Sequence, residues 1–560
     1  MPVSENPRSQ LATHEVTNQP TPFGDRNVFS GDAIARDYVT HALGTVADAA
    51  AKSAHLSHLQ QFGSTVGCEE AREHGRLANE SLPKLTPFDR YGHRIDEVEF
   101  HPSYHALMDM GLSGGVSSRA WTHKAGGHVA HTALMTLMTW ADAGVTCPMS
   151  MTYAVSAVLQ DTDWTRENWF PAVTSGIYDP AVKPLSEKRG ATMGMAMTEK
   201  QGGSDVRANS TRATAIPGTD DEVQLLGHKW FCSAPMCDGF LTLAYEDAGL
   251  SCFLVPRWRP DGSRNAMEIQ RLKDKLGDRS NASSEIEYRN AWARRVGEPG
   301  RGVKTIINMV HHTRLDCAAG SAANMRIGLA LAAHHATGRS VFQKKLVDQP
   351  LMQATLSDMT LEVEAAYALL FEEAAAFDKA AAGDEDAAML SRILAPVAKY
   401  WICKRAPALS AEAMECHGGV GYVEETGMPR LFRQSPLNSI WEGSGNVIAL
   451  DIQRALMAPP VLAALQTRLS AHKGADGRLD QMIGRLLNPK GFLDQGEAGL
   501  RAFSEKLALV LQATALMAGP ESALADAFIR TRIAAPALAF GGSTERLPHD
   551  LLMGRAVIAA

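Results

Sequence analysis

The sequence has 560 residues, which is too long for one hydrophobic core, so several structural units are expected. Its hydrophobic fraction of 45%, charged fraction of 21% and formal net charge of −7 are typical of a soluble globular protein, and they exclude a global attraction to nucleic acid or to an anionic membrane. Eight scattered cysteines favour reduced thiols, and no metal site is predicted because zinc-ligand spacing is missing. The N-terminus has no secretory pattern, and the apolar stretch 507–518 is too short to span a bilayer. We therefore expect a cytoplasmic protein without membrane contact.

Hydrophobic patterning predicts four regions along the chain. Residues 1–192 are expected to form a polar arm and a helical domain, with one helix over 120–143. Residues 193–300 contain short alternating runs between turn residues, which predict a small β-domain with strands at 223–226, 241–244, 252–255 and 285–288. Residues 301–458 predict a helical bundle with helices over 305–336, 350–382, 391–415 and 446–457. Residues 459–560 are again helical. The fold class is therefore mainly α with a central antiparallel β-domain.

Two segments of the predicted β-domain have the composition of a ligand site. The segment 196–205, Ala-Met-Thr-Glu-Lys-Gln-Gly-Gly-Ser-Asp, places glycines beside hydroxyl and carboxylate groups, so its backbone can approach a flat polar ring or a phosphate. It lacks the glycine patterns of a Walker loop or a Rossmann fold, and it could equally be a structural turn. In the segment 227–233, Gly-His-Lys-Trp-Phe-Cys-Ser, one aromatic ring is expected to pack in the core while the other could cover a cofactor ring.

A third segment, 415–446, contains a candidate base. Its glycine cluster is followed by Glu442, which lies between Trp441 and Gly443. A carboxylate beside an apolar wall on a loop is partly desolvated, and desolvation raises its pKa toward the range that suits proton abstraction. The alternative is a helix-capping acid that opens the helix predicted from about residue 446.

In this order, the three segments resemble the acyl-CoA dehydrogenases over about residues 193–457. The segment 196–205 is similar to the family pattern Thr-Glu-x-x-x-Gly-Ser-Asp, and the segment 415–430 is similar to a second family pattern. The likeness is closer to the AidB branch, which is associated with the adaptive response to DNA alkylation. It rests on four stretches of the sequence: 198–205, 227–231, 273–277 and 438–446. The resemblance implies a helical domain, a β-barrel-like domain and a helical bundle, followed by the additional C-terminal helical domain.

The resemblance also implies chemistry. FAD would be the cofactor, Glu442 would remove the α-proton of a short or branched acyl-CoA, and the β-hydrogen would leave as hydride to flavin N5. Arg314 would bind substrate, and Arg339 would reach the FAD pyrophosphate of a neighbouring subunit in a homotetramer. The positions that match FAD-binding residues of the family are Met195, Thr198, Ser204, Phe231, Cys232, Ser233, Arg339, Gly418, Gly419, Trp441, Gly443, Ser444 and Asn446.

Four positions depart from the family pattern. Gln343 stands in place of a usual glycine, Pro350 and Glu415 stand in place of glutamines, and His311 stands in place of an aspartate in the helix that binds CoA. These departures affect substrate and interface positions, while the positions expected at the flavin match the pattern.

Two other functions are compatible with the sequence. The AidB likeness suggests a flavoprotein that binds double-stranded DNA weakly and protects it against alkylation, with Arg454 as a contact. Residues 461–560 carry nearly balanced charges, although Arg478, Arg485, Arg530 and Arg532 could cluster in space. The second alternative is a flavin oxidase, such as an acyl-CoA oxidase or a nitroalkane oxidase. A nitroalkane oxidase is expected to use aspartate at the position of Glu442.

Overall fold

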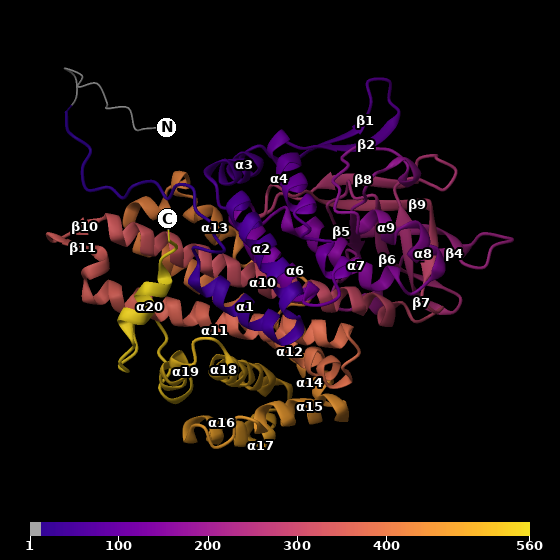
Figure 1. Ribbon diagram of the computed structural model, residues 1–560. Coiled ribbons are helices and arrows are strands. Elements are labelled where there is room, and N and C mark those ends of the chain that lie inside the picture. The colour runs from indigo at the N-terminus through magenta and orange to yellow at the C-terminus, as the bar shows by residue number, and fades with distance from the viewer. Residues whose placement is uncertain (1–12, 560) are drawn as a thin grey trace.

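The computed structural model describes residues 13–559, so the first 12 residues of the predicted arm lie outside the described residues. Nine helices follow the arm (Figure 1): α1 Ala33–Val46, α2 Ala49–Val66, α3 Glu69–Glu80, α4 Pro102–Ser113, α5 Arg119–Thr122, α6 Gly127–Ala141, α7 Thr146–Leu159, α8 Asp163–Asn168 and α9 Phe170–Val173. The predicted helix over 120–143 is divided into α5 and α6, because the chain breaks between them where Gly126 has φ +77°. The hairpin of β1 Lys84–Phe88 and β2 Arg94–Glu99 was also not predicted.

The β-domain begins at Met193. Its strands are β3 Met193–Ala196, β4 Arg212–Ala215, β5 Glu222–Ser233, β6 Gly239–Glu246, β7 Gly249–Pro256, β8 Met267–Leu272 and β9 Ser283–Val296. All four strands predicted for this domain are confirmed. The strand order is β3-β6-β4-β5-β9-β7, and a further β6–β7 pairing closes the sheet into a barrel, with β8 added to β9. The sheet is mixed rather than purely antiparallel, because β3 and β4 both pair with β6 in parallel.

Three long helices form the bundle. They are α10 Gly302–Gly338, α11 Pro350–Ala381 and α12 Glu385–Cys416, close to the predicted ranges, and they are followed by α13 Met428–Gln434 and α14 Gly445–Leu456. The helix α10 is buried along most of its length, because it packs against α6 and α7 of the N-terminal domain as well as α11 and α12. Figure 1 shows α10 running from the sheet at one end of the molecule to the small hairpin of β10 Ser340–Val341 and β11 Lys344–Lys345 at the other.

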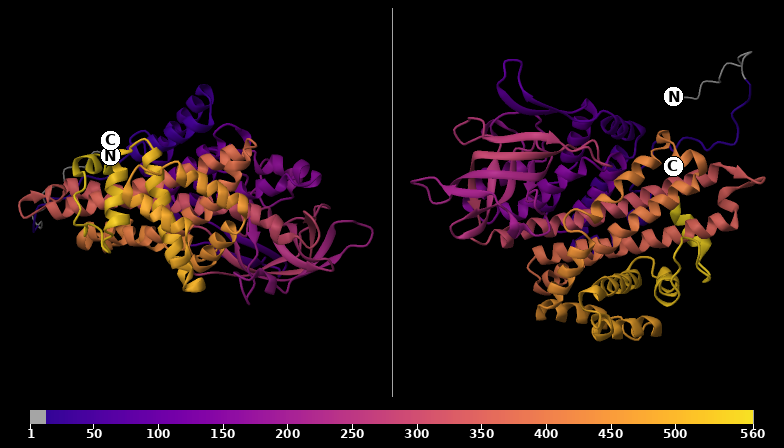
Figure 2. Two further views of the ribbon diagram at one scale, coloured as in Figure 1. Left: turned by 90° about the horizontal axis from the view of Figure 1, so that it is seen from below. Right: turned by 180° about the vertical axis from the view of Figure 1, so that it is seen from behind.

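The C-terminal domain is helical, as predicted. Its helices are α15 Pro459–Ser470, α16 Gly477–Leu487, α17 Lys490–Leu493, α18 Leu500–Ala518, α19 Ala523–Phe528 and α20 His549–Ala556. Its helices α15 and α18 lie against α11 and α12, whereas α20 also reaches α1, where Arg555 pairs with Asp37 (Figures 1 and 2). Three arginines tie it to carboxylates of α11: Arg468 pairs with Glu372, Arg532 with Asp358 and Glu362, and Arg555 with Glu364.

Within residues 13–559, no single helix is long and apolar enough to cross a membrane. The pair α14 and α15 reaches the required length and hydropathy only when the two helices are taken together, and they meet at an angle of 94°.

Candidate active site

The segment Trp441–Gly443 forms a loop between the 3₁₀ turn Leu437–Ser439 and α14. Glu442 adopts φ +57° and Gly443 adopts φ +104°, so two consecutive residues are in the left-handed region. A glutamate rarely adopts this conformation, and such backbone outliers concentrate at functional sites. The N-cap residue of α14 is Ser444, two positions later. Glu442 therefore does not cap the helix, which removes the alternative explanation for this residue.

Two buried cations hold the loop through its carbonyl groups. The guanidinium of Arg314 on α10 donates from Nε to the Glu442 carbonyl over 3.2 Å, and Lys399 Nζ on α12 donates to the Gly443 carbonyl. Arg314 is itself fixed by an ion pair with Asp451 of α14 at 2.6 Å. Because the guanidinium of Arg314 is committed to these two groups, the structure gives it a role in positioning the loop, in addition to the predicted contact with substrate.

The side chain of Glu442 is half-buried, and its Oε2 atom is shielded from solvent. Among residues 13–559, this oxygen has no hydrogen-bond partner. Burial raises the pKa of Glu442 above the ordinary value of 4.5, whereas the nearby Thr313 hydroxyl and the charges of Arg314 and Lys399 act to lower it. A carboxylate with a raised pKa and one oxygen free of hydrogen bonds can accept a proton from a bound molecule.

In the β-domain, a buried ion pair joins the first predicted segment to the second. Glu199 Oε1 and Lys229 Nζ are 2.9 Å apart, and both side chains have no exposed surface. The Glu199 carboxylate also accepts hydrogen bonds from the backbone and hydroxyl groups of Ser210 and Thr211. The two segments are linked again by the backbone N–H of Trp230, which donates to the Thr198 carbonyl over 2.7 Å. The glutamate of the first segment is therefore a structural anchor for the loop that carries Thr198.

Alternation along β5 separates the predicted cofactor residues. The Phe231 ring is 47% exposed, the Ser233 hydroxyl is half-buried and bonded to the Ser283 hydroxyl at 3.0 Å, and the Cys232 thiol is fully buried. Only the backbone of Cys232 could therefore face a ligand on the Phe231 side. On the neighbouring segment, Met195 and Thr198 are half-buried and Ser204 is exposed.

The β-domain reaches the Glu442 loop through the segment between β8 and β9. Ala234, just after Ser233, donates its N–H to the Ala282 carbonyl over 2.8 Å. Further along this segment, Gly277 packs so closely on the Arg433 carbonyl that an added Cβ would lie 2.5 Å from the oxygen. The end of β5 and the loop before Glu442 therefore converge on one region of the molecule.

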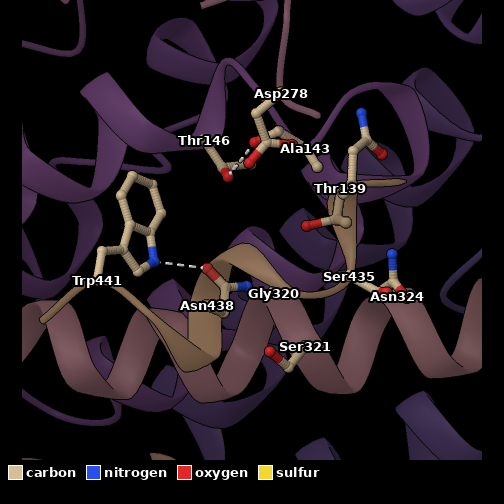
Figure 3. A pocket seen from close by; sticks show the side chains of 11 residues that line it. Thr139, Ala143, Thr146, Asp278, Gly320, Ser321, Asn324, Ser435, Asn438 and Trp441 are labelled. Carbon is tan, nitrogen blue, oxygen red and sulfur yellow. Dashed lines mark hydrogen bonds between the residues drawn. The ribbon is translucent and has the colours of Figure 1, made fainter. Parts of the chain in front are cut away.

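A cavity opens at this convergence, between the α6–α7 turn, α10 and the chain leading to Glu442. Its volume is about 20 Å³, which is room for about one water molecule. Figure 3 shows Thr146, Asp278 and Thr139 approaching it on one side and Asn438 and Ser321 on the other, with the Trp441 ring at one end. Its lining residues are Thr139, Ala143, Thr146, Asp278, Gly320, Ser321, Asn324, Gln434, Ser435, Asn438 and Trp441. Eight of these eleven residues have polar side chains, so the cavity is lined mainly by polar groups.

A second group of predicted cofactor residues lies far from Glu442 in the same chain. Arg339 follows the last residue of α10, and its guanidinium donates to the Asn18 carbonyl over 2.8 Å. Gly418 and Gly419 are close to it, because the His417 ring lies 4.7 Å from the His335 ring of α10. A helix rises about 1.5 Å per residue, so Arg339 is about 37 Å from Arg314 along α10. One chain therefore does not bring the two groups of predicted residues together.

The remaining predicted residues surround α14. The Trp441 indole N–H donates to Asn438 Oδ1 over 2.8 Å, the Ser444 side chain is exposed, and Asn446 Oδ1 accepts from Arg501 of α18 over 2.9 Å. Arg454 is exposed in the last turn of α14.

The arginines suggested as a basic cluster do not form one. Arg478 and Arg530 share Asp526, and Arg532 pairs with Asp358 and Glu362. Arg485 instead lies over the Phe492 ring. The C-terminal domain therefore presents a surface on which most of these charges are neutralised.

Some residues at the site were not predicted from the sequence. Lys399, Asp278, Ser321 and Gln434 are the main ones. Lys399 could have been recognised, because it is the only charged residue in the otherwise apolar run 393–402. The others belong to three distant parts of the chain and meet only in the folded molecule.

Comparisons with known proteins agree with this architecture. Three family models match consecutive parts of the chain: the N-terminal domain of the adaptive response protein AidB at residues 18–180, the middle domain of acyl-CoA dehydrogenases at 194–291 and their C-terminal domain at 300–457. The AidB protein of Escherichia coli strain K12 is 43% identical over 85% of this chain and 86% of its own length.

Solved structures extend the similarity to the C-terminal domain. The structure of Caenorhabditis elegans ACDH-11 in complex with C11-CoA has a TM-score of 0.83 and 27% identity, covering 94% of this chain and 95% of that one. The apo form of Bd2924 has a TM-score of 0.82 and 28% identity, covering 90% and 99%.

Proposed function

Because the chain belongs to the acyl-CoA dehydrogenase family, we propose that it is an FAD-dependent enzyme that oxidises the Cα–Cβ bond of a short or branched acyl-CoA, with Glu442 as the base. The observation that carries this proposal is the Glu442 carboxylate. It is half-buried on a loop in the left-handed conformation, its carbonyl is fixed by Arg314, and its Oε2 atom is shielded and unpartnered within residues 13–559.

The residues at the end of the β-domain fit the cofactor. The Thr198 hydroxyl has no hydrogen-bond partner in the described part of the chain, and Ser233 offers a second hydroxyl. The exposed Phe231 ring lies on the same strand as Ser233. An exposed aromatic ring beside available hydroxyl groups suits a flat heterocycle with polar edges. When bound, FAD supplies the acceptor for the hydride that leaves the β-carbon.

The chain itself supplies the proton acceptor. Glu442 takes the α-proton of the thioester onto its unpartnered oxygen, and the cations at its backbone keep the loop in place as the carboxylate gains and loses its proton. Burial keeps the pKa of Glu442 raised, which makes the carboxylate a stronger base than an exposed glutamate.

Anaerobic addition of acyl-CoA thioesters to the FAD-loaded protein tests this proposal. We expect isovaleryl-CoA or a similar short or branched thioester to bleach the flavin. Glu442→Gln should slow bleaching by about 10²- to 10⁴-fold, because general base catalysis contributes that much. Glu425→Gln, a change at an exposed glutamate outside the site, should leave the rate unchanged. FAD binding without reduction by any thioester would contradict the proposal, and hydrogen peroxide formed on turnover in air would instead indicate an oxidase.

We further propose that the active enzyme is an oligomer of at least two subunits, and that it is a homotetramer. The end of the bundle that carries Arg339 supports this proposal, because several large apolar side chains there are exposed. Phe342 is 92% exposed, Leu351 85% and Tyr422 82%. Such a patch is typical of an association surface. Arg339, Gly418 and Gly419 would then meet the cofactor of a neighbouring subunit. Analytical ultracentrifugation of wild type and Phe342→Ser tests this, and a monomeric wild-type protein that retains FAD would contradict it.

Similarity to AidB favours a second candidate function, which is weak association with double-stranded DNA. Arg454 is exposed and has no ion-pair partner among the described residues, whereas Arg478, Arg530 and Arg532 are neutralised by carboxylates. We therefore expect few phosphate contacts and a shallow dependence of affinity on salt concentration. Arg454→Gln should weaken binding of a DNA duplex at low salt. Binding that is insensitive to both this substitution and salt would exclude phosphate contacts by Arg454.

A further inference from the structure

A second, larger cavity lies where the C-terminal domain meets the rest of the molecule, and none of the predicted site residues lines it. Its volume is about 300 Å³, and residues in or directly after α1, α11, α12, α15 and α18 form its walls. Seven of the seventeen lining residues are alanines. Because these side chains are short, the five helices leave a space that no side chain fills. A volume of this size is at the lower end of the range for small-molecule sites.

The cavity is separate from the Glu442 loop, because α12 lies between them. Leu390 of α12 lines the cavity, whereas Arg392 pairs with Asp451 beside the Glu442 loop. Successive residues of a helix are about 100° apart around its axis, so Arg392 lies about 200° from Leu390. The two sites therefore occupy opposite faces of one helix.

The cavity is elongated and has an exposed rim. Its residues on α11 run from Ala368 to Lys379, which is about 16 Å of helix. The floor is apolar, since Phe371 and Ala375 line it and are at most 7% exposed. His41 and Lys379 are exposed residues of the rim. A long apolar floor with an exposed polar rim suits an unbranched hydrocarbon chain that carries one polar end.

The two ends of the cavity differ in packing and in charge. At one end Tyr38 of α1 packs against Gly519, so closely that a Cβ added to the glycine would lie 3.2 Å from the ring. Tyr38 is also close to Glu364, one turn before Ala368 on α11. The other end carries Lys379, in the last turn of α11, and its ammonium has no partner within residues 13–559. A bound molecule would therefore have its apolar end toward Tyr38 and its polar end at Lys379.

The charges of the lining favour a single negative charge on that polar end. Arg468 is the second cation, and its guanidinium pairs with the Glu372 carboxylate through Nε and Nη2. Burial and the charge of Arg468 lower the pKa of His472, so this ring adds no charge at neutral pH. Among the lysine, arginine and glutamate side chains of the lining, one positive charge remains, on Lys379. One carboxylate would neutralise it.

We propose that this cavity binds the anion of an unbranched fatty acid of medium chain length, with the carboxylate at Lys379 and the chain along the alanine-rich face of α11. The site is additional to the proposed active site and does not depend on its chemistry. A bound chain would contact α11, α15 and α18 together, so it should stabilise the attachment of the C-terminal domain to the bundle.

Isothermal titration calorimetry of the FAD-loaded protein with hexanoate, octanoate, decanoate and dodecanoate tests the site. We expect the affinity to rise about fourfold for each CH₂ group that enters the cavity, and to level off once the chain fills it. Hydrogen exchange read by mass spectrometry locates the ligand. Decanoate should slow exchange in the segments 38–45, 368–379 and 515–519, which line the cavity.

Variants assign binding to the cavity. Ala375→Leu and Ala515→Leu fill it from α11 and from α18, and each should weaken decanoate binding tenfold or more. Thermal unfolding establishes that each variant is folded, and the exchange map of the wild type does not depend on either.

A second pair of variants tests the position of the carboxylate. Lys379→Met should weaken decanoate binding by about three- to tenfold and leave binding of uncharged 1-decanol unchanged, because it removes a charge-assisted hydrogen bond at an exposed rim. Lys304→Met is the matched control. Lys304 is an exposed lysine on α10 that has no side-chain partner in the described part of the chain and does not line the cavity. This variant should bind decanoate as the wild type does.

Several results would overturn the proposal. Decanoate that does not bind at millimolar concentration, or that binds equally well to both leucine variants, would show that the cavity holds no fatty acid. Equal effects of Lys379→Met on decanoate and 1-decanol would show that Lys379 does not receive the carboxylate. Decanoyl-CoA distinguishes the two sites, since Ala375→Leu should leave its binding and its reduction of the flavin unchanged. Loss of thioester binding in this variant would show that the cavity belongs to the active site instead.

Discussion

Replacing Lys229 with methionine should free the loop that carries Thr198. The substitution keeps an unbranched side chain that is one atom shorter, but it leaves the Glu199 carboxylate without its cation, in a place where neither partner of the pair has exposed surface. Removing one member of a buried ion pair costs about 3–5 kcal/mol. Because every 1.4 kcal/mol is a factor of ten, local opening of the loop should become roughly 10²- to 4×10³-fold more frequent.

Hydrogen exchange read by mass spectrometry measures this opening directly. The Ser210 and Thr211 amides donate to Glu199, so their exchange should accelerate by that factor in Lys229→Met, and FAD should bind more weakly. Arg289→Met is the control within the same sheet, because Arg289 is 60% exposed and its ion pairs should contribute less than about 1 kcal/mol. Exchange of the loop amides that changes less than threefold in Lys229→Met would refute the reasoning.

The same pair gives a dependence on pH with a definite sign. Burial alone would raise the pKa of Glu199, but the charge of Lys229 and the hydrogen bonds from Ser210 and Thr211 hold it well below the ordinary value of 4.5. The carboxylate therefore stabilises the fold above pH 4.5, and this contribution is lost as the pH falls below that value. In Lys229→Met the pKa of Glu199 should be higher, so protection of the loop should be lost at a higher pH than in the wild type.

Three further predictions follow from the Glu442 loop and the β10–β11 hairpin. The wild-type rate of flavin reduction should rise with pH through a pKa above 4.5, because Glu442 must be ionised to accept a proton. In urea unfolding at neutral pH, Glu442→Gln should be at least as stable as wild type, because the raised pKa makes the ionised carboxylate a cost to folding. A less stable variant would contradict this. Arg314→Met should destabilise the protein by about 3 kcal/mol and slow flavin reduction, because it breaks a buried ion pair. Arg392→Met should have a smaller effect, because the Arg392 side chain is 37% exposed and Asp451 keeps its buried partner Arg314. Equal losses of stability in the two variants would count against the proposed positioning of the loop by Arg314. Gln343→Gly should stabilise the protein by about 0.5–1 kcal/mol in thermal unfolding, since Gln343 has φ +63°; a loss of stability would show that its side chain makes contacts that outweigh the backbone strain.

The periodicity of apolar residues predicted the positions of helices and strands better than it predicted which strands pair. Four of the seven strands of the β-domain and the three long helices were identified because their apolar residues repeat with the spacing of a buried face, whereas β3, β4 and β8 were not predicted. The parallel pairing of β3 with β6 could not be predicted, since a strand pattern does not specify its neighbour. The β1–β2 hairpin was missed because Pro87 and several charged residues obscure its alternation, although Gly92 at its turn was a usable signal.

For the site, the sequence motifs predicted which residues belong to it, but not how far apart those residues lie in one chain. Glu442 and Thr198 were singled out from the sequence, and the structure links the β-domain to the chain before Glu442 through the segment between β8 and β9. The separation of about 37 Å between Arg339 and Arg314 follows only from the unbroken length of α10. The burial of Cys232 could have been predicted, because it alternates with Phe231 on one strand. The departure at Gln343 now has a physical meaning, since the glycine usual in the family suits the positive φ found at that position.

The left-handed backbone at Glu442 also has a consequence for protein engineering. Glycine is the residue that best tolerates φ +57°, and it would bring no carboxylate into a shielded position. A library of this gene sorted only for heat resistance should therefore enrich the substitution Glu442→Gly over the native residue, and the recovered proteins should be robust and unable to remove the α-proton. Selection for higher thermal stability should therefore keep the codon for Glu442 unchanged.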